Sequence, residues 1–326
     1  MTGIALLGAG FMADTHARCY EALRDRAQVR VVCGLESDRV AELAERLGAE
    51  ATDDLDTALA VPGVDAVDVC LPTPLHRPMA ERALAAGRHV LLEKPIALSL
   101  DDADAIGAAA EAAGRVLMVG HVLRFMPEVA ELRRVLASGE LGRVLGASAR
   151  RLSAPPDWND WMRDEELSGG ALVDLAIHDF DVLGALLGPA RSVYARAVSG
   201  HVSALVQHEQ GEGLVEGSHA MPASYPFTAN LRVLCERGVL EHRFVAGAGD
   251  EVADDVISEL GVFAGEARRF SVPGDPWQLE IEHFLDCVVT GSKPADGSFE
   301  QARAALAVAL AARRSLAAGQ PEPVER

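Results

Sequence analysis

Short apolar runs alternate with amphipathic stretches along the first third of the chain. The pattern predicts strands at 4–10, 29–35, 64–72, 89–95 and 115–125, with helices between them at 12–25, 37–48, 76–87 and 99–114. The strand-like runs are continuous and rich in β-branched residues, as expected of strands buried on both faces. This part of the chain is therefore predicted to form a doubly wound parallel sheet with helices on both sides.

The pattern changes after residue 125. Helices are predicted at 126–142, 168–188, 277–291 and 299–319, and strands at 143–152, 192–200, 202–210, 213–221 and 227–244. Residues 245–275 have no clear pattern and are expected to include loops. Strands that follow one another without helices favour an open, mostly antiparallel sheet. The expected fold class is α/β, with a first domain at 1–122 and a second, α+β domain at 123–326.

Composition and charge narrow the class of partner. The 326 residues suffice for two domains, and a net charge of −19 disfavours binding to nucleic acid or to an anionic membrane. The first apolar run is short and has no basic residues before it, so neither a signal peptide nor a membrane span is expected. The five cysteines lack metal-ligand spacing, which predicts free thiols in the reducing cytoplasm and no metal site.

The segment GAGFMA at 8–13 follows the first strand and opens the first helix. It matches the G-x-G-x-x-G/A fingerprint of Rossmann dinucleotide-binding domains, with Ala13 in the third position. Gly8 permits the tight turn, and Gly10 lets the backbone approach a pyrophosphate at the positive end of the helix. We expect Gly8, Gly10, Phe11 and Met12 to contact the cofactor.

The end of the second strand bears on the choice between NAD and NADP. An acidic residue there commonly binds the adenosine ribose, but this strand ends in CGLES, with Gly34 at the usual acidic position. Glu36 is either the ribose ligand or an exposed charge at the start of a helix. Arg39 lies a turn further on and is expected to be solvated. The sequence therefore favours NAD and leaves NADP possible.

Lysine is rare in this chain. All basic residues except Lys94 and Lys293 are arginine, and Lys94 ends a strand of the nucleotide-binding domain, just before Pro95. Ligands of such sheets bind beyond the carboxyl ends of the strands. A lysine is compact and can lose its proton when desolvated, whereas arginine stays charged, so we expect Lys94 in the cleft rather than on the surface.

A second polar cluster lies in ALVDLAIHDFDVL at 171–183. Asp174 and His178 are four residues apart, so on a helix they share one face, with Asp181 further along it. The pair is either a carboxylate that orients a histidine base or a set of polar groups satisfied within a domain. Asp179 is expected to be a solvated or capping charge.

These segments together resemble the Gfo/Idh/MocA oxidoreductases, the family of glucose-fructose oxidoreductase and inositol dehydrogenase. The resemblance extends almost from end to end, and the combination of EKP with a later GGxxxDxxxHxxD is specific. It is carried by GAGFMADTH (8–16), PTPLH (72–76), AAGRHVLLEKP (85–95), RFMPEVAELRRVLASGELG (124–142), SGGALVDLAIHDFDVLGALLG (168–188) and FLDCVVTGSKP (284–294).

The resemblance implies a cytoplasmic NAD(P)-dependent enzyme that moves hydride between nicotinamide and a secondary alcohol of a sugar, inositol or related polyol. It implies that His178 takes the hydroxyl proton, Lys94 holds the reacting oxygen, and Asp174 orients His178 or binds a neighbouring hydroxyl. Two alternatives remain open, a reductase of another small carbonyl, imine or dihydrodiol and a non-catalytic NAD(P)-binding regulator.

The resemblance also implies further cofactor contacts and an oligomer. Thr73 stands where asparagine is common in the family, and Gly34 departs from its acidic position. The second domain is expected to bind substrate and to form a homodimer or homotetramer through its sheet. The further cofactor contacts are Leu71, Pro72, Thr73, His76, Glu93, Lys94, Arg124 and Trp161.

Overall fold

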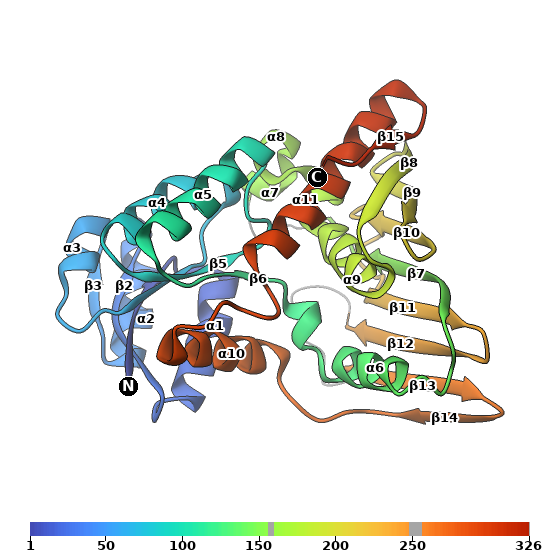
Figure 1. Ribbon diagram of the computed structural model, residues 1–326. Helices are drawn as coiled ribbons and strands as arrows, with labels where there is room; N and C mark the ends of the chain where they lie inside the picture. Colours follow the sequence, from blue (N-terminus) through green and yellow to red (C-terminus); the bar gives the residue numbers. More distant parts are fainter. Residues whose placement is uncertain (156–159, 248–255, 326) are drawn as a thin grey trace. The chain divides into compact units, whose positions relative to one another are not determined.

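The chain folds into two compact units in the computed structural model, which describes residues 1–155, 160–247 and 256–325 (Figure 1). Unit 1 comprises residues 1–122 and 275–303, and unit 2 comprises residues 123–274 and 304–326. The boundary after residue 122 coincides with the predicted one. The structure differs in placing 275–303 in unit 1, because helix α10 (Pro276–Thr290) packs against α1 (Phe11–Ala22).

Unit 1 is a parallel six-stranded sheet in the order β3-β2-β1-β4-β5-β6. Helices α4 and α5 pack together on one face, while α1 packs with α2 and α10 on the other (Figure 1). The strands are β1 (Thr2–Leu7), β2 (Ala27–Cys33), β3 (Glu50–Thr52), β4 (Ala66–Val69), β5 (His89–Glu93) and β6 (Leu117–Gly120). The helices are α2 (Ser37–Leu47), α3 (Leu55–Ala60), α4 (His76–Ala85) and α5 (Leu100–Ala113). The strand order reverses between β1 and β4, the place where such sheets bind ligands.

Local sequence signals explain where these helices begin and end. The Ser99 hydroxyl accepts the backbone N–H of Asp102 at the start of α5. Gly48 and Gly114 end α2 and α5 in the left-handed conformation, where their N–H groups bond the last carbonyls of the helix. The short β3 and α3 were not predicted, because segments of three and six residues carry too little periodicity.

Unit 2 is built on a nine-stranded sheet in the order β14-β13-β12-β11-β7-β10-β9-β8-β15. Only β7 and β10 pair in parallel, so the predicted α/β class with a second, mostly antiparallel sheet is confirmed. The strands are β7 (Val144–Leu152), β8 (Ala190–Val198), β9 (His201–His208), β10 (Glu212–Ser218), β11 (Phe227–Cys235), β12 (Gly238–Ala246), β13 (Ile257–Ala264), β14 (Glu266–Phe270) and β15 (Glu322–Pro323).

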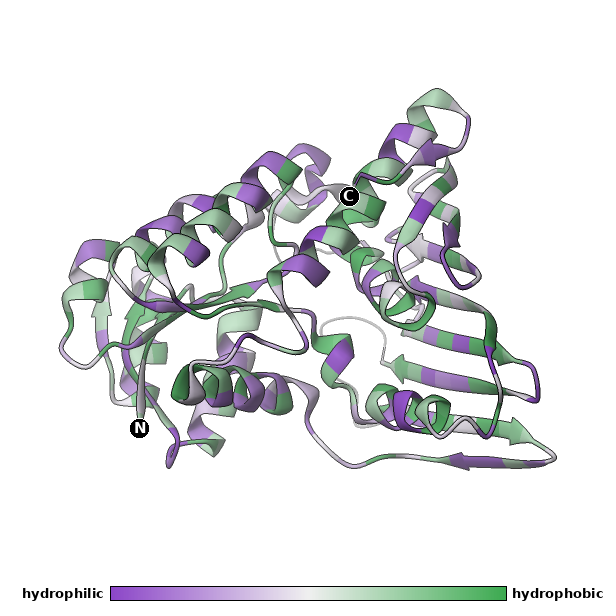
Figure 2. Cartoon of the chain, viewed as in Figure 1, coloured by the Kyte–Doolittle hydropathy of each residue, from purple (hydrophilic) through white to green (hydrophobic). Residues whose placement is uncertain are grey.

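Helices cover one face of this sheet, where α9 (Ile177–Leu187) packs on β7 and β10, and α6 (Pro127–Ala137) packs on β12 and β13. Figure 2 shows β11 and β12 striped alternately hydrophilic and hydrophobic, whereas the parallel strands of unit 1 are mostly hydrophobic. The remaining long helix, α11 (Phe299–Ala318), begins in unit 1 and ends in unit 2.

One strand prediction for unit 2 was wrong. The run 227–244 is a hairpin rather than one strand, because Glu236 and Arg237 turn the chain and Cys235 pairs with Gly238. The segment 245–275, expected to include loops, also contains the paired strands β13 and β14, which were not predicted, and its residues 248–255 lie outside the described part of the chain.

Candidate functional site

The glycine loop after β1 leaves open space at the N-terminus of α1. Gly8 has φ of +108°, and a Cβ there would overlap the carbonyl oxygen of Cys70 at the end of β4. A Cβ built on Gly10 meets no atom within 4 Å, and no side chain caps the first turn of α1. The uncapped N–H groups and the positive end of the helix dipole therefore face open space, an arrangement that favours an anion. Phe11 is exposed and Met12 is half-buried beside this space.

The start of α2 carries the predicted ribose ligand. Glu36 lies directly before the helix with an exposed side chain, and its Oε2 accepts a 3.0 Å hydrogen bond from Nη1 of Arg39. A Cβ at Gly34 would lie 3.0 Å from Cγ2 of Val40, so an acidic side chain at that position would require Val40 to move. Glu36 is thus an accessible carboxylate at this strand end, and its partner Arg39 is exposed to solvent, as expected.

His76 ties together the loops that follow β4 and β5. Its Nε2 lies 2.8 Å from the Leu71 carbonyl oxygen, and its Nδ1 lies 2.8 Å from that of Pro95. Burial lowers the pKa of this imidazole, although the two carbonyls oppose the shift. Because both ring nitrogens already face backbone carbonyls, His76 acts on the site by holding these loops. Thr73 is buried in the same turn, and Leu71 and Pro72 are half-buried.

Glu93 and Lys94 occupy the carboxyl end of β5. The Glu93 carboxylate is buried, and its Oε2 accepts the backbone N–H of Lys94 at 3.0 Å. A Cβ at Gly120, on the neighbouring strand β6, would lie 3.2 Å from Glu93 Oε1, so glycine provides the room for this carboxylate. The half-buried Lys94 is followed by a cis peptide bond to Pro95. Glu93 is therefore placed to fix the backbone that carries Lys94.

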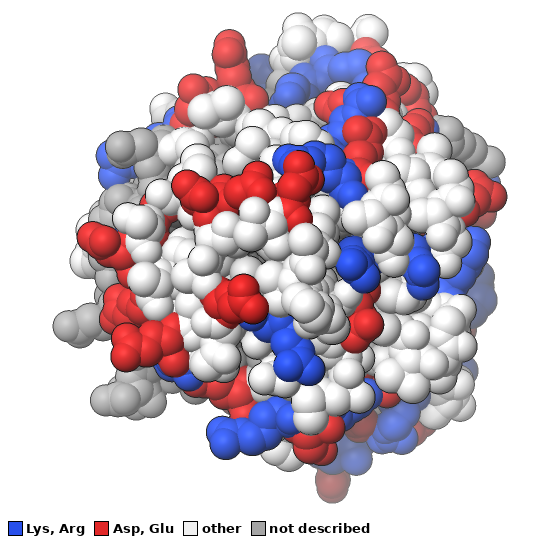
Figure 3. All heavy atoms as spheres, turned by 90° about the vertical axis from the view of Figure 1, so that its left-hand side faces the viewer, with Lys and Arg blue, Asp and Glu red and all other residues white. Residues whose placement is uncertain are grey.

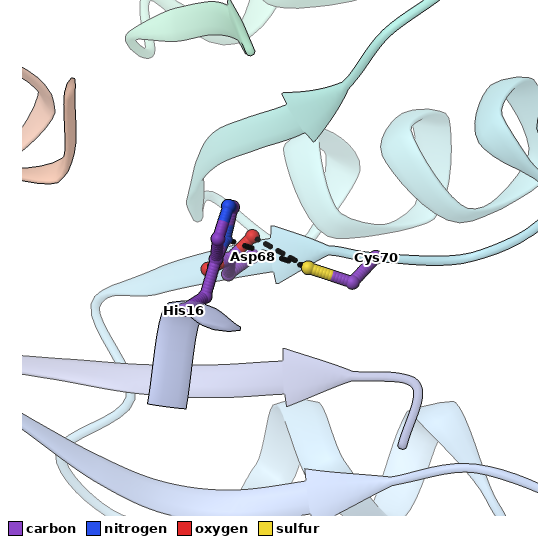
Figure 4. Close-up of side chains that lie close together, drawn as sticks. All are labelled: His16, Asp68 and Cys70. Carbon is purple, nitrogen blue, oxygen red and sulfur yellow. Dashed lines mark hydrogen bonds and ion pairs between the residues drawn. The ribbon is translucent and has the colours of Figure 1, made fainter. Parts of the chain in front are cut away.

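Unit 1 also contains a buried cluster that the sequence did not predict. His16 comes from α1, Asp68 from β4, and Cys70 from the end of β4, and their side chains converge in Figure 4. His16 Nδ1 lies 2.8 Å from Asp68 Oδ2, and the Cys70 thiol lies 3.4 Å from Asp68 Oδ1. The hydroxyl of Tyr20 also donates to Asp68 Oδ2, at 2.9 Å. His16 and Asp68 are 52 residues apart, so no local spacing could have revealed the cluster.

A pair of glycines shapes the second predicted cluster, in unit 2. Gly169 and Gly170 both have positive φ, and a Cβ at Gly169 would overlap the side chain of Val173. A π-helical turn at Ala171–Leu175 follows, and α9 starts only at Ile177. The prediction of one helix over 168–188 was therefore wrong in its first turns. Asp174 lies in the π turn and His178 in α9, so they do not share one continuous α-helical face.

Asp174 has a partner that the sequence analysis missed. Its Oδ2 lies 3.3 Å from Nε2 of His219, which follows β10, and the Nδ1 of His219 lies 2.8 Å from the hydroxyl of Ser153. Asp174 is buried and His219 is half-buried. The three residues form a Ser–His–Asp chain of contacts across β7 and β10, which pair in parallel and bring residues 152 and 218 into register.

Two buried ion pairs hold α9. Arg124 donates from Nε and Nη2 to both oxygens of Asp181 at 2.7 Å, and Arg151 contacts Asp179 at 3.0 and 3.2 Å. Asp179, expected to be solvated, is 2% exposed, and burial raises its pKa although Arg151 opposes the shift. That expectation was wrong because β7 brings Arg151 underneath the helix. Arg124, a predicted cofactor contact, has its guanidinium engaged by a carboxylate.

The predicted site residues fall in both units. Unit 1 brings together the glycine loop, the Leu71–His76 turn and the Glu93–Lys94 strand end, all at carboxyl ends of parallel strands. Unit 2 contains Arg124, Asp174, His178 and Trp161, the last half-exposed in the short helix α7 (Asp160–Arg163).

The charged surface of unit 1 is mixed. Figure 3 views the side that carries α3 and β3, where acidic and basic side chains are interspersed over the visible face. Within the described residues, none of the helices combines the length and the apolar character required to cross a membrane.

Comparisons with known proteins bear on both units. Residues 2–121 match the oxidoreductase family with an NAD-binding Rossmann fold, and residues 129–241 match the GFO/IDH/MocA C-terminal domain. The scyllo-inositol 2-dehydrogenase (NAD(+)) of Bacillus subtilis is 28% identical over 97% of this chain and 94% of its own length. A myo-inositol dehydrogenase of Streptomyces leeuwenhoekii is 30% identical over 97% and 98%.

A solved structure is similar over the same length. GenD2 from gentamicin A biosynthesis, in complex with NAD, has a TM-score of 0.85 and 26% identity, covering 100% of this chain and 97% of its own. The two family matches include the glycine loop, the strand ends that carry Glu36 and Lys94, and the turn that carries Asp174.

Proposed function

This chain belongs to the Gfo/Idh/MocA family of oxidoreductases, and from that premise we propose that it oxidises a secondary alcohol of inositol or of a related cyclic polyol or sugar. The predicted family and the predicted NAD-binding domain are confirmed. The chain is an NAD(P)-dependent oxidoreductase acting on CH–OH groups, with an NAD-binding Rossmann domain. The observation that carries the substrate class is the match, over nearly the full length of both proteins, to two inositol dehydrogenases.

We propose that Lys94, Asp174 and His178 carry the proton chemistry. When bound, the nicotinamide supplies the site that accepts hydride from the alcohol carbon. Lys94, at the strand end fixed by Glu93, would hold the reacting oxygen, and His178 would take the hydroxyl proton. Asp174 would orient His178 and His219 and stabilise their positive charge, or it would bind a neighbouring hydroxyl of the substrate. Two observations support these roles. The residues match the family motif, and Glu93 Oε2 accepts the backbone N–H of Lys94 and so fixes the backbone of this residue.

The cofactor contacts follow the same reasoning. We propose that the open end of α1 holds the pyrophosphate, with Gly8, Gly10, Phe11 and Met12 around it. The remaining proposed contacts are Glu36, Leu71, Pro72, Thr73, Glu93, Lys94, Arg124 and Trp161, with His76 as the support of their loops.

The Glu36→Ala substitution tests the choice of cofactor. Loss of an accessible carboxylate that binds the ribose hydroxyls is expected to weaken NADH binding about tenfold, or ~1.4 kcal/mol. NADPH binding should weaken less, because its 2′-phosphate is repelled by a carboxylate. Nicotinamide fluorescence titration with both cofactors measures this, with Glu42→Ala on the exposed face of α2 as the control. Equal losses for both cofactors would remove Glu36 from the ribose site.

His219→Gln tests the newly found partner of Asp174. His219 supports a carboxylate at 3.3 Å rather than acting on substrate, so its loss should reduce kcat by less than the roughly 10²–10⁴-fold expected of a direct acid–base group. The pH profile of kcat should shift, while NADH affinity stays near that of the wild type. His201→Gln, which removes a half-buried histidine beside Glu216 in the same unit, is the control. A pH profile identical to the wild type would make His219 merely structural.

A panel of substrates tests the function itself. The purified protein is incubated with NAD and myo-inositol, scyllo-inositol or a glucoside, and the NADH formed is followed by absorbance. For the reverse direction it is incubated with NADH and a simple acyclic ketone or imine, and the NADH consumed is followed in the same way. Turnover of a cyclic polyol supports the proposal. Turnover confined to another carbonyl or imine would move the enzyme to the first alternative. Tight NADH binding without turnover of any class would favour a regulator.

We propose a homodimer or homotetramer formed through the open face of the nine-stranded sheet. The face opposite α9 carries a groove with exposed apolar side chains, and arginines and glutamates lie beside them. Apolar patches rimmed by charge are typical of protein interfaces. The apolar members are Tyr194, Leu205 and Leu214. Size-exclusion chromatography with light scattering measures the molar mass of the protein in solution. A monomer at micromolar concentration would contradict the proposed oligomer.

We also propose that the enzyme works in the reducing cytoplasm. All five cysteines are free, and burial raises the pKa of the Cys33 thiol to about 11 and that of Cys19 to about 12. Such thiols are unreactive as thiolates and match a compartment where disulfides do not form.

A further inference from the structure

The imidazole of His16 lies between two buried carboxylates that come from different strands. Its Nδ1 is 2.8 Å from Asp68 Oδ2 on β4, and its Nε2 is 3.3 Å from Glu93 Oε1 on β5. His16 is completely buried, and Nε2 forms no hydrogen bond with the described residues, so this ion pair is the polar contact of that nitrogen. The histidine links α1, the helix that follows the glycine loop, to both strands, and no step of the proposed reaction uses it.

The Glu93 carboxylate connects this histidine to the backbone of Lys94. Its Oε1 faces the imidazole, while its Oε2 accepts the Lys94 N–H at 3.0 Å. The two oxygens therefore have different partners, and a rotation of the carboxylate away from one partner also moves it away from the other. Gly120, on the neighbouring strand β6, has no side chain to pack against this group. The orientation of the Glu93 carboxylate thus depends on the contacts at its two oxygens.

The contacts of His16 favour a proton on both ring nitrogens. A carboxylate only accepts hydrogen bonds, and each ring nitrogen faces one. Burial by itself lowers the pKa of His16, but Asp68 outweighs burial and holds the pKa well above its usual value. The resulting imidazolium attracts Glu93 on one side. On the other side, Asp68 Oδ2 also accepts the Tyr20 hydroxyl at 2.9 Å, which holds Asp68 in place.

We propose that His16 is a positioning residue for Lys94, because it orients the Glu93 carboxylate that fixes the Lys94 backbone. The assignment rests on the proposed role of Lys94 in the reaction. His16 does not exchange a proton with the substrate in this role. It lies on the helix whose first turn is proposed to hold the pyrophosphate, so one side chain ties the strand end that carries Lys94 to the helix that binds the cofactor.

The presence of only two lysines makes the Lys94 backbone directly observable without any substrate. Protein that contains ¹⁵N-labelled lysine should show two lysine amide signals in its NMR spectrum, and Lys293→Arg removes one of them. In His16→Gln the Lys94 signal should move, and its amide hydrogen should exchange with solvent roughly tenfold faster, because the carboxylate that accepts it is held less firmly. The Lys293 signal should stay in place. An unchanged Lys94 signal and exchange rate would overturn the proposal.

Tyr20→Phe is the matched control within the same buried cluster. It removes the other hydrogen bond to Asp68 Oδ2 and leaves the contact between His16 and Glu93 intact. The variant should lose stability, but its Lys94 amide should behave as in the wild type. If Tyr20→Phe disturbs that amide as much as His16→Gln does, the cluster is only structural and the positioning role is overturned.

The ring nitrogens of the histidines provide a test that does not require His16→Gln to fold. In the wild type, one histidine should keep both ring protons at pH 8, far above the ordinary histidine pKa of about 6.5. Glu93→Gln should move the Nε2 signal of that histidine, because it removes the charge that faces this nitrogen. A spectrum in which every histidine is neutral at pH 8, or no response to Glu93→Gln, would overturn the proposal.

Kinetics test whether the contact acts on the reaction. With any polyol that the wild type turns over, His16→Gln should lower kcat by on the order of 10- to 100-fold, as expected of a misplaced catalytic group, and leave NADH affinity near that of the wild type. Tyr20→Phe should keep the wild-type kcat. At saturating NAD, the His16→Gln/Glu93→Gln double variant should lose no more kcat than Glu93→Gln alone, because both changes break one chain of contacts. Additive losses would mean that His16 acts independently of Glu93.

The outcomes separate this proposal from the proposed function. If no polyol is turned over but the Lys94 amide responds to His16→Gln, the substrate assignment fails and the link from His16 to Lys94 stands. If the amide responds while kcat stays at the wild-type value, the link is structural and the positioning role is overturned. Turnover that survives Lys94→Ala would remove the premise and overturn the positioning role as well.

Discussion

The Lys94→Ala variant is expected to lose activity by on the order of 10²–10⁴-fold, the range typical of a direct acid–base group, and to lose far less NADH affinity, because Lys94 is one of many proposed cofactor contacts. The reason lies in the position of the residue. Lys94 follows the carboxyl end of β5, its backbone N–H is fixed by Glu93 at 3.0 Å, and its side chain is half-buried. A cation held there lowers the energy of a developing alkoxide and can exchange its proton. Steady-state kinetics and NADH fluorescence titration on the same preparation measure the two effects.

The chain provides a matched control, because its only other lysine is exposed. Lys293→Ala should leave both turnover and cofactor binding unchanged. Lys94→Arg distinguishes charge from proton exchange, since arginine keeps the positive charge and does not give up its proton. We expect this variant to remain far below the wild type. Substantial turnover by Lys94→Ala would remove the residue from the chemistry and leave it a structural cation beside the cofactor.

The parallel sheet could be predicted because its signals are local. Continuous apolar runs, helix stops at Gly48 and Gly114 and the glycine loop at Gly8 each lie within one segment of chain. The failures came where short or paired elements carry weak periodicity. The hairpin at 227–246 was predicted as one strand, because Glu236 and Arg237 at its turn are not residues typical of turns.

The sequence allowed candidate site residues to be named one by one, but it did not reveal the contacts among them. Lys94 and the glycine loop were recognisable because one is rare in this chain and the other is a motif. Partners came from distant segments, as when Arg151 on β7 buries Asp179 and His219 after β10 meets Asp174. A single sequence does not show which residues of neighbouring strands lie opposite one another. That register brings Arg151 to Asp179 and His219 to Asp174.

The π turn shows where the geometry predicted for the Asp174–His178 pair was wrong. The two residues were paired because four residues separate them in a helix. The structure places Asp174 in a π turn, after two glycines with positive φ, and His178 in α9. Such turns are common at functional sites, where they redirect a side chain at the expense of helix stability. Gly169 and Gly170 in direct succession were the available signal that a regular helix does not start at residue 168.

The Glu280→Gln substitution is expected to stabilise the protein increasingly as the pH rises. Burial, the charge of Glu93 and that of Asp68 raise the pKa of Glu280 well above its ordinary value of 4.5, while His16 opposes the shift. The folded protein therefore retains a proton that the unfolded chain releases above pH 4.5. Stability from this group is complete below that pH and falls by about 1.4 kcal/mol for each unit toward the folded pKa.

Urea unfolding of both proteins at pH 6, 7 and 8 measures the expected slope. The free energy of unfolding of Glu280→Gln minus that of the wild type should increase by about 1.4 kcal/mol per pH unit. Glu282→Gln on the same helix should leave the slope unchanged, because that side chain reaches solvent. A difference independent of pH would mean that Glu280 is ionised when buried.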